Sequence, residues 1–348
     1  MGPSSSPRPT RRRLLASSVA VFGSIAGCSS LTERTATTTD PGQTTDAGVS
    51  GTTAETSASE LLSINASGAL YPVVREAAAV WNLNPSPADD WYWAPSRYDL
   101  DTDRRLADHF AGERGFEPTG ERSRPPFSIA VGSGPPTAVA EDVASGAVDL
   151  GGTPSHVAAV LPHYEDTEGY VEHAVARTGS VFVVSDDLVD EGVTALTPAE
   201  VRDVYAGEVT NWRAVGGPDR AIHVVTSAEG EPPRRIVTDF FEDTSLTGID
   251  HRAGQIPRRL RRVDERDDAI ADVRVGGHVG KGAQPLDVIV DGKRVGYRDA
   301  AYPTVHDARL YVWQETDDHE RAFLDMIRSS FGQQTFVVDQ RGLVELGQ

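Results

Sequence analysis

The segment from Leu196 to Arg235 constrains the fold most, because its cap and turn residues predict a fixed order of elements. Thr197 is a favoured helix N-cap, and Glu200, three residues later, completes a capping box. Gly207 follows the last apolar position and is typical of a helix end. The sequence therefore predicts a helix that begins after Thr197 and ends at Gly207.

Downstream of this helix, the same segment predicts a turn, a strand and a loop. Residues 216–219 read Gly-Gly-Pro-Asp, which is typical of a turn, and the apolar run Ile222 to Val225 predicts a buried strand. Ser227 to Gly230 then predicts a loop that leads into another helix. Loops of this kind bind anions through the free amides of a helix N-terminus.

The stretch Leu196 to Asp219, with Asn211-Trp212 before the turn, resembles the middle of the phosphate-binding proteins that feed ABC importers. Further similarity is found in Phe331 to Gln334 and in the return strand Arg309 to Trp313. The resemblance implies an α/β protein with the two-lobed periplasmic-binding-protein type II fold. In this fold each lobe is a mixed sheet flanked by helices, and the ligand cleft lies between the lobes.

The N-terminal residues 1–27 are typical of an export signal. A twin-arginine motif at Thr10 to Leu15 precedes the apolar run Leu14 to Ala26, and Ile25 to Cys28 resembles a lipobox. We expect cleavage before Cys28, lipidation of that residue and an extracytoplasmic location on the outer face of the membrane. The alternative is a short membrane anchor or a disordered basic tail.

Residues 28–60 predict a flexible tether, because they consist mainly of Ser, Thr, Gly and acidic residues and cannot form a core. Cys28 is the only cysteine, so an intramolecular disulfide is impossible.

The charge of the chain points to its environment. The formal charge is −19, and removal of residues 1–27 takes away four arginines and no acid, which leaves −23. Lys281 and Lys293 are the only lysines, and this bias resembles proteins of extreme halophiles. In molar salt the Debye length is roughly 3 Å, so self-repulsion is weak. We expect a monomer that does not bind nucleic acid.

The folded part is predicted to form two lobes, because about 290 residues approach the limit of a single core. Lobe 1 comprises residues 61–178 and 302–348, and lobe 2 comprises residues 179–301. Residues 82–127 form an insertion relative to the usual pattern, with a predicted helix from Asp103 to Phe110. Its Trp91-Tyr92-Trp93 cluster could bind a sugar or a partner, or form a small satellite core.

Several loops in the first lobe carry candidate ligands for an oxyanion. A strand from Leu61 to Ile64, a turn of small residues and a helix form the arrangement in which α/β proteins bind ligands at the carboxyl ends of strands. Glycines allow close backbone approach, and hydroxyl groups donate hydrogen bonds. Ser67 could also be a plain N-cap. The predicted first-lobe residues are Ser67, Gly68, Ser133, Thr137 and Thr153.

The second lobe contributes Glu229, Gly230 and Arg234, but its loop departs from the family pattern. In relatives the loop carries an arginine and Ser-Gly-Thr, which hold the anion. Here Ser227 replaces the arginine and Glu231-Pro232-Pro233 replaces the Ser-Gly-Thr. Losing several charged hydrogen bonds, each worth roughly 1.5 to 3 kcal/mol, weakens oxyanion affinity.

The sequence gives little support for catalysis or metal binding. Its nine histidines are scattered, with no metal-binding spacing, and no G-x-S-x-G elbow is present. We therefore expect no metal, no cofactor and no enzymatic activity. The resemblance implies capture of a phosphate-like solute by lobe closure and its delivery to an ABC permease. The alternatives are a member of the family that binds another ligand, a surface partner-docking or sensory protein, and a surface hydrolase.

Overall fold

A parallel group of three strands opens the folded part of the chain. The computed structural model describes residues 61–162, 167–227, 240–241, 244–276, 279–280, 283–339 and 343–346. Strands β1 (Leu61–Ala66), β2 (Ser128–Ser133) and β3 (Leu150–Thr153) pair in parallel, with β1 in the middle. Helices α2 (Leu70–Leu83) and α4 (Pro136–Ser145) follow β1 and β2. The carboxyl ends of the three strands therefore lie at one edge of the sheet.

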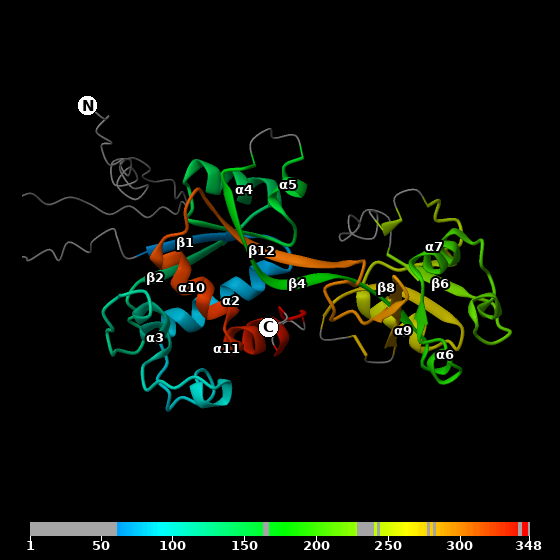
Figure 1. Ribbon diagram of the computed structural model, residues 1–348, viewed down its shortest axis with the longest axis horizontal. Coiled ribbons are helices and arrows are strands. Elements are labelled where there is room, and N and C mark those ends of the chain that lie inside the picture. The colour runs from blue at the N-terminus through cyan, green and yellow to red at the C-terminus, as the bar shows by residue number, and fades with distance from the viewer. Residues whose placement is uncertain are drawn as a thin grey trace, which may run out of the picture. The chain divides into compact units, whose positions relative to one another are not determined.

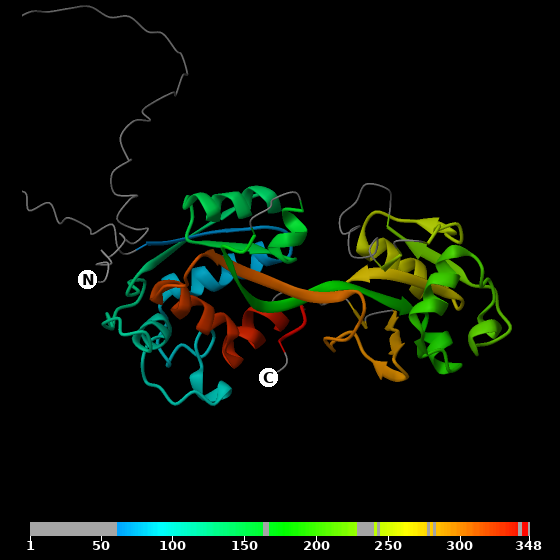
Figure 2. The same ribbon diagram turned by 45° about the horizontal axis from the view of Figure 1, so that its top comes forward.

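Two long strands connect this group to a second one. Strand β4 (Tyr170–Val184) pairs with β12 (Val305–Trp313) in antiparallel orientation up to Gly179, and from Ser180 onward it pairs with β8 (Ala269–Arg274). Figures 1 and 2 show β4 and β12 side by side along this length. The strand order is β2-β1-β3-β12-β4-β8-β6-β7, so one mixed sheet runs through both groups.

The second group is again parallel. Strands β6 (His223–Thr226) and β7 (His251–Arg252) pair in parallel with each other, and β6 also pairs in parallel with β8. Helices α7 (Pro198–Ala206) and α9 (Ile256–Asp264) accompany them. The remaining elements of this group are α6 (Asp186–Asp190), η2 (Trp212–Val215), β9 (Gln284–Pro285) and a small sheet of β5 (Ala195–Leu196), β10 (Asp287–Val290) and β11 (Lys293–Val295).

Buried side chains form two large cores, one for each group. The first contains Trp81 and Phe323, and the second contains Trp212 and Tyr205; all four are at most 1% exposed. We call the elements around the first core the first lobe and those around the second core the second lobe. This arrangement confirms the predicted two-lobed α/β class, while the proposed boundaries at 178/179 and 301/302 stay a prediction. The first lobe also contains η1 (Pro95–Tyr98), α3 (Leu106–Gly112), α5 (Val157–Val160), α10 (Asp318–Arg328), α11 (Ser330–Gly332) and η3 (Gln333–Asp339).

Within the opening segment the predicted helix and strand are confirmed, as α7 and β6, whereas the loop and helix predicted after Ser227 lie outside the described residues. Thr197 caps α7, accepting a hydrogen bond from the Glu200 amide, and the Glu200 side chain accepts one from the Thr197 amide. Gly207 ends the helix with φ of 78°. Asp291-Gly292 between two apolar runs predicts a hairpin over residues 284–297, and this hairpin is present: both residues have positive φ and join β10 to β11 in an antiparallel pair.

Several predicted boundaries were wrong by two to ten residues. The run Val148 to Gly151 predicts a strand, whereas β3 spans 150–153, because its pairing with β1 begins at Leu150. The apolar run Ser180 to Ser185 predicts a strand that connects the lobes, but this strand, β4, begins at Tyr170, since its first half is paired with β12. In both cases pairing with distant strands decides the boundary.

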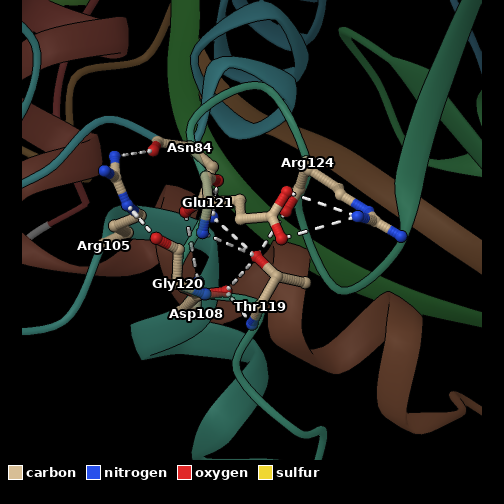
Figure 3. A network of polar contacts seen from close by, with 7 residues as sticks. All are labelled: Asn84, Arg105, Asp108, Thr119, Gly120, Glu121 and Arg124. Atoms are coloured by element: carbon tan, nitrogen blue, oxygen red, sulfur yellow. Dashed lines mark hydrogen bonds and ion pairs between the residues drawn. The ribbon is translucent and has the colours of Figure 1, made fainter.

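A polar network around two buried side chains, Asn84 and Asp108, holds the predicted insertion at 82–127 together (Figure 3). Asn84 is 0% exposed, and its side-chain oxygen accepts a hydrogen bond from the Ala107 amide. Asp108 accepts hydrogen bonds from the amides of Thr119 and Gly120. The predicted helix at 103–110 begins three residues later, as α3. The insertion is thus an ordered part of the first lobe.

The aromatic cluster of the insertion divides into two kinds of residue. Trp93 is fully buried in the first core, and its indole N–H donates to the Arg104 carbonyl. Trp91 is 87% exposed and Tyr92 is 40% exposed. The cluster therefore joins the main core through Trp93 and does not form a separate satellite core. No helix among the described residues is long and apolar enough to cross a membrane.

Candidate functional site

The carboxyl ends of β1, β2 and β3 bring the predicted first-lobe residues to one edge. Ala66, the last residue of β1, lies opposite both Ser133 of β2 and Gly152 of β3. Ser67 and Thr153 each follow directly after one of these paired positions. In α/β proteins this edge is where ligands bind, so the strand register supports a common site.

Ser67 and Gly68 fix the first loop against β3. Ser67 is 3% exposed, its amide donates to the Gly152 carbonyl at 2.9 Å, and its hydroxyl donates to the same carbonyl at 3.4 Å. Gly68 has φ of 53°, and a Cβ there would lie 3.0 Å from Cγ of Pro154. The cap position of α2 is Ala69, so the reading of Ser67 as an N-cap was wrong.

The other predicted hydroxyl groups differ in whether they are exposed and free to bind a solute. Thr153 is 0% exposed, and its hydroxyl donates to the Ser155 carbonyl at 2.7 Å. Ser133 and Thr137 are exposed, at the end of β2 and in the first turn of α4. Since Ser67 and Thr153 already donate to carbonyls, Ser133 and Thr137 are the predicted hydroxyls that can donate to a solute without breaking such a bond.

The start of α4 is poor in donors, as the sequence suggests. Pro135 occupies the N-cap position with no side-chain cap, and Pro136 is the first helical residue. Neither residue has an amide hydrogen. An anion at this helix end would therefore depend on the hydroxyls of Ser133 and Thr137 more than on backbone donors.

Charged residues that sequence reasoning missed lie on β12 and β4, near the end of β3. Arg309 of β12 lies opposite Thr153 in the β3 pairing, 3.6 Å from Glu172 of β4 and 2.8 Å from Asp307. Glu172 also lies 3.2 Å from His156. The positive charge of Arg309 is thus balanced by the carboxylates of Glu172 and Asp307. The alternation of charged residues along β12 was the available signal, but only the pairing of β12 with β3 and β4 shows that they meet.

The second lobe presents a corresponding edge at the carboxyl end of β6. Thr226 ends this strand, and Ser227 follows with 7% exposure. The hydroxyl of Thr226 donates to Oδ1 of Asp272 at 2.5 Å. The predicted ligands Glu229, Gly230 and Arg234 lie outside the described residues, as does Cys28. Their roles stay predictions.

Asp272 is a buried carboxyl group that sequence reasoning missed. It is 2% exposed on β8, and burial raises its pKa to about 6, against the hydrogen bond from Thr226 and the charge of Arg259, which both lower it. The sequence signal was an aspartate inside the apolar strand 269–273. Within the described ranges, no group of three or more His, Cys, Asp or Glu residues is placed to hold a metal ion.

Comparisons with known proteins agree with this architecture. Residues 116–312 match the PBP superfamily domain. The chain is 24% identical over 203 residues to the phosphate-binding protein PstS of Bacillus subtilis, which covers 57% of this chain and 65% of that protein. The match thus spans less than two thirds of this curated relative.

Two solved structures share the fold. An ABC-type phosphate transport receptor from Vibrio cholerae has a TM-score of 0.55 at 16% identity, with 82% of this chain and all of that chain covered. PstS from Borrelia burgdorferi has a TM-score of 0.55 at 15% identity, with 83% of this chain and all of that chain covered. With a superfamily match over more than half of its length, this chain belongs to the periplasmic-binding-protein (PBP) superfamily.

Proposed function

We propose that this protein is an extracytoplasmic solute-binding lipoprotein of an ABC import system. It captures an oxyanion, most favourably phosphate, by closure of its lobes. The observation that carries the proposal is the register that gathers Ser67, Ser133 and Thr153 at one sheet edge. It is supported by the superfamily match and by relatives whose names state phosphate binding or transport. Hinge closure around a ligand is a common motion of such folds.

Calorimetric titration of the purified chain with phosphate in high salt tests this proposal. We expect saturable heat at or below roughly millimolar phosphate, which corresponds to about 4 kcal/mol of binding free energy or more. If phosphate and sulfate both give no saturable heat at that concentration, capture of an oxyanion is ruled out.

The exposed hydroxyls offer a sharper test of where the anion binds. Ser133→Ala and Thr137→Ala should each lower phosphate affinity roughly tenfold, because a hydrogen bond to a charged group contributes about 1.5 kcal/mol. Ser145→Ala is the matched control, since Ser145 is an exposed serine at the other end of α4. Unchanged affinity in both test variants would place the anion elsewhere.

A second candidate function is binding of a ligand other than an oxyanion, or docking of a partner. It is favoured by the hydroxyls of Ser67 and Thr153, which already donate to carbonyls, and by the prolines at 135 and 136. Titration with phosphate separates the two, because this second candidate predicts no oxyanion binding at any pH.

Membrane attachment through Cys28 has its own test. The proposal predicts that the expressed chain fractionates with membranes and carries a lipid on Cys28, as measured by mass spectrometry. Cys28→Ser should move the chain to the soluble fraction without a change in solute affinity. Copurification with a permease and an ATPase would support delivery to an ABC importer.

A further inference from the structure

Three buried ionisable side chains of the second lobe take no part in the site predicted from sequence. They come from different elements: Asp272 from β8, Arg259 from α9 and Tyr205 from α7. Their exposed fractions are 2%, 2% and 0%. Buried charges are rare unless they are paired or functional, because taking a charge out of water costs several kcal/mol. Their positions in the fold therefore help to decide whether they have a function.

Asp272 and Arg259 lie near the carboxyl edge of the second-lobe sheet. Val225 pairs with Ala271, so Thr226 and Asp272 are the next positions along β6 and β8, and they are joined by a side-chain hydrogen bond of 2.5 Å. Ala253 donates its amide to the Thr226 carbonyl, and its own carbonyl accepts from Arg259. Asp272 and Arg259 are thus both tied to the end of β6, where ligands of such sheets bind.

Asp272 and Arg259 do not form a direct ion pair with each other. Among the described residues, no ion pair within 4.0 Å joins them, and Nε of Arg259 has no hydrogen-bond partner. Their charges still act on each other in the low-dielectric interior, because Arg259 lowers the pKa of Asp272 against the larger effect of burial. The ionised carboxylate therefore offsets the field of a buried guanidinium.

Within the part of the chain that the structure describes, the other groups that face Asp272 add one cation and no further carboxylate. Thr226 faces it from β6 as a neutral donor, and Arg252 acts on it from β7 as a second cation. Tyr205 faces it from α7, and burial raises the pKa of this tyrosine well above its usual value, so it stays neutral. Protonation of Asp272 would leave two cations at this edge without their carboxylate.

We propose that Asp272 couples the binding of an oxyanion at the carboxyl edge of β6 and β8 to the uptake of one proton. The inference deepens the proposed function and rests on it. The proton comes from solvent and is held by the Asp272 carboxylate. An anion bound near this carboxylate disfavours its ionisation, so binding and protonation favour each other by linkage. Since burial already raises the pKa of Asp272 to about 6, the exchange falls in an accessible pH range.

Sulfate is the probe that isolates this coupling, because it stays a dianion where phosphate itself titrates. We expect the affinity of the wild-type chain for sulfate to rise about tenfold between about pH 7.5 and about pH 5, the change that a pKa shift of about one unit in the bound state produces. Calorimetry near pH 6.5 in buffers of different ionisation enthalpy should show net proton uptake.

The variant Asp272→Asn should bind sulfate with the same affinity at both pH values, close to that of the wild type at the lower pH. Its heat of binding should not depend on the buffer. Asp287→Asn, in the small sheet of the same lobe, removes the same charge and should keep the wild-type pH dependence. An unchanged pH dependence in Asp272→Asn would overturn the inference alone. Failure of wild type and both variants to bind any oxyanion would overturn the proposed function together with it.

Discussion

The sheet edges of the two lobes differ in how their buried polar groups are satisfied. In the first lobe Ser67 and Thr153 donate to backbone carbonyls, and the charge of Arg309 is balanced by Glu172 and Asp307. In the second lobe Asp272 accepts one side-chain hydrogen bond from Thr226 and has no cation within ion-pair distance among the described residues. The charges of the first edge are thus paired, whereas burial without a paired cation raises the pKa of Asp272 in the second.

The largest expected effect tests whether the two cores are independent. Trp81 and Trp212 are both 0% exposed, and each indole N–H donates to a carbonyl at 2.9 Å. Trp81→Ala and Trp212→Ala should each lower the free energy of unfolding by about 4 kcal/mol. We expect amide hydrogen exchange to accelerate mainly in the lobe that carries the change. Equal acceleration in both lobes would show that the continuous sheet makes them one cooperative unit.

The second prediction contrasts the carboxylates of the two lobes. Asp149 accepts two hydrogen bonds of 2.8 Å from Ser63, so Asp149→Asn should destabilise the fold by about 2 kcal/mol. Asp272→Asn should stabilise it at neutral pH by up to about 3 kcal/mol, because a pKa raised from 3.8 to about 6 means that the ionised form is disfavoured in the fold.

The pH dependence of that second effect has a definite sign. Burial makes the folded state hold the proton of Asp272 more tightly than the unfolded state does. The stability that the folded state gains from protonated Asp272 is therefore fully present below about pH 4 and is lost as the pH rises through about 6. Thermal unfolding should show Asp272→Asn more stable than wild type at pH 7.5 and equal to it below about pH 4. A constant difference across this range would contradict the assignment.

The smallest expected effect concerns the rigidity of the first edge. Gly68 has positive φ and lies against Pro154, whereas Gly216 has φ of 85° with no atom within 4 Å of a built Cβ. Gly216→Ala should cost about 1 kcal/mol for the left-handed conformation alone. Gly68→Ala should cost about 2 kcal/mol and also reduce phosphate affinity. Equal losses in chemical denaturation would mean that Pro154 does not constrain the loop.

The sequence was most informative where structure is decided locally. The capping box of Thr197 and Glu200 and the hairpin turn at Asp291 depend on neighbouring residues, and the structure confirms both. Residues whose roles depend on strand pairing were missed. Asp272 and Arg309 gain their surroundings from strands far away in the chain, and no local pattern specifies which strands become neighbours.

The closed polar network of the insertion has a consequence for engineering this protein. Ser123 donates its amide to the Leu83 carbonyl at 2.8 Å, and Asn84 donates to the Glu121 carbonyl, so the two ends of the segment are fastened together. A segment with joined ends can change length between them at a small entropic cost. Foreign peptides could therefore be grafted into its exposed stretch near Asp101, provided that Trp93 keeps its place in the core.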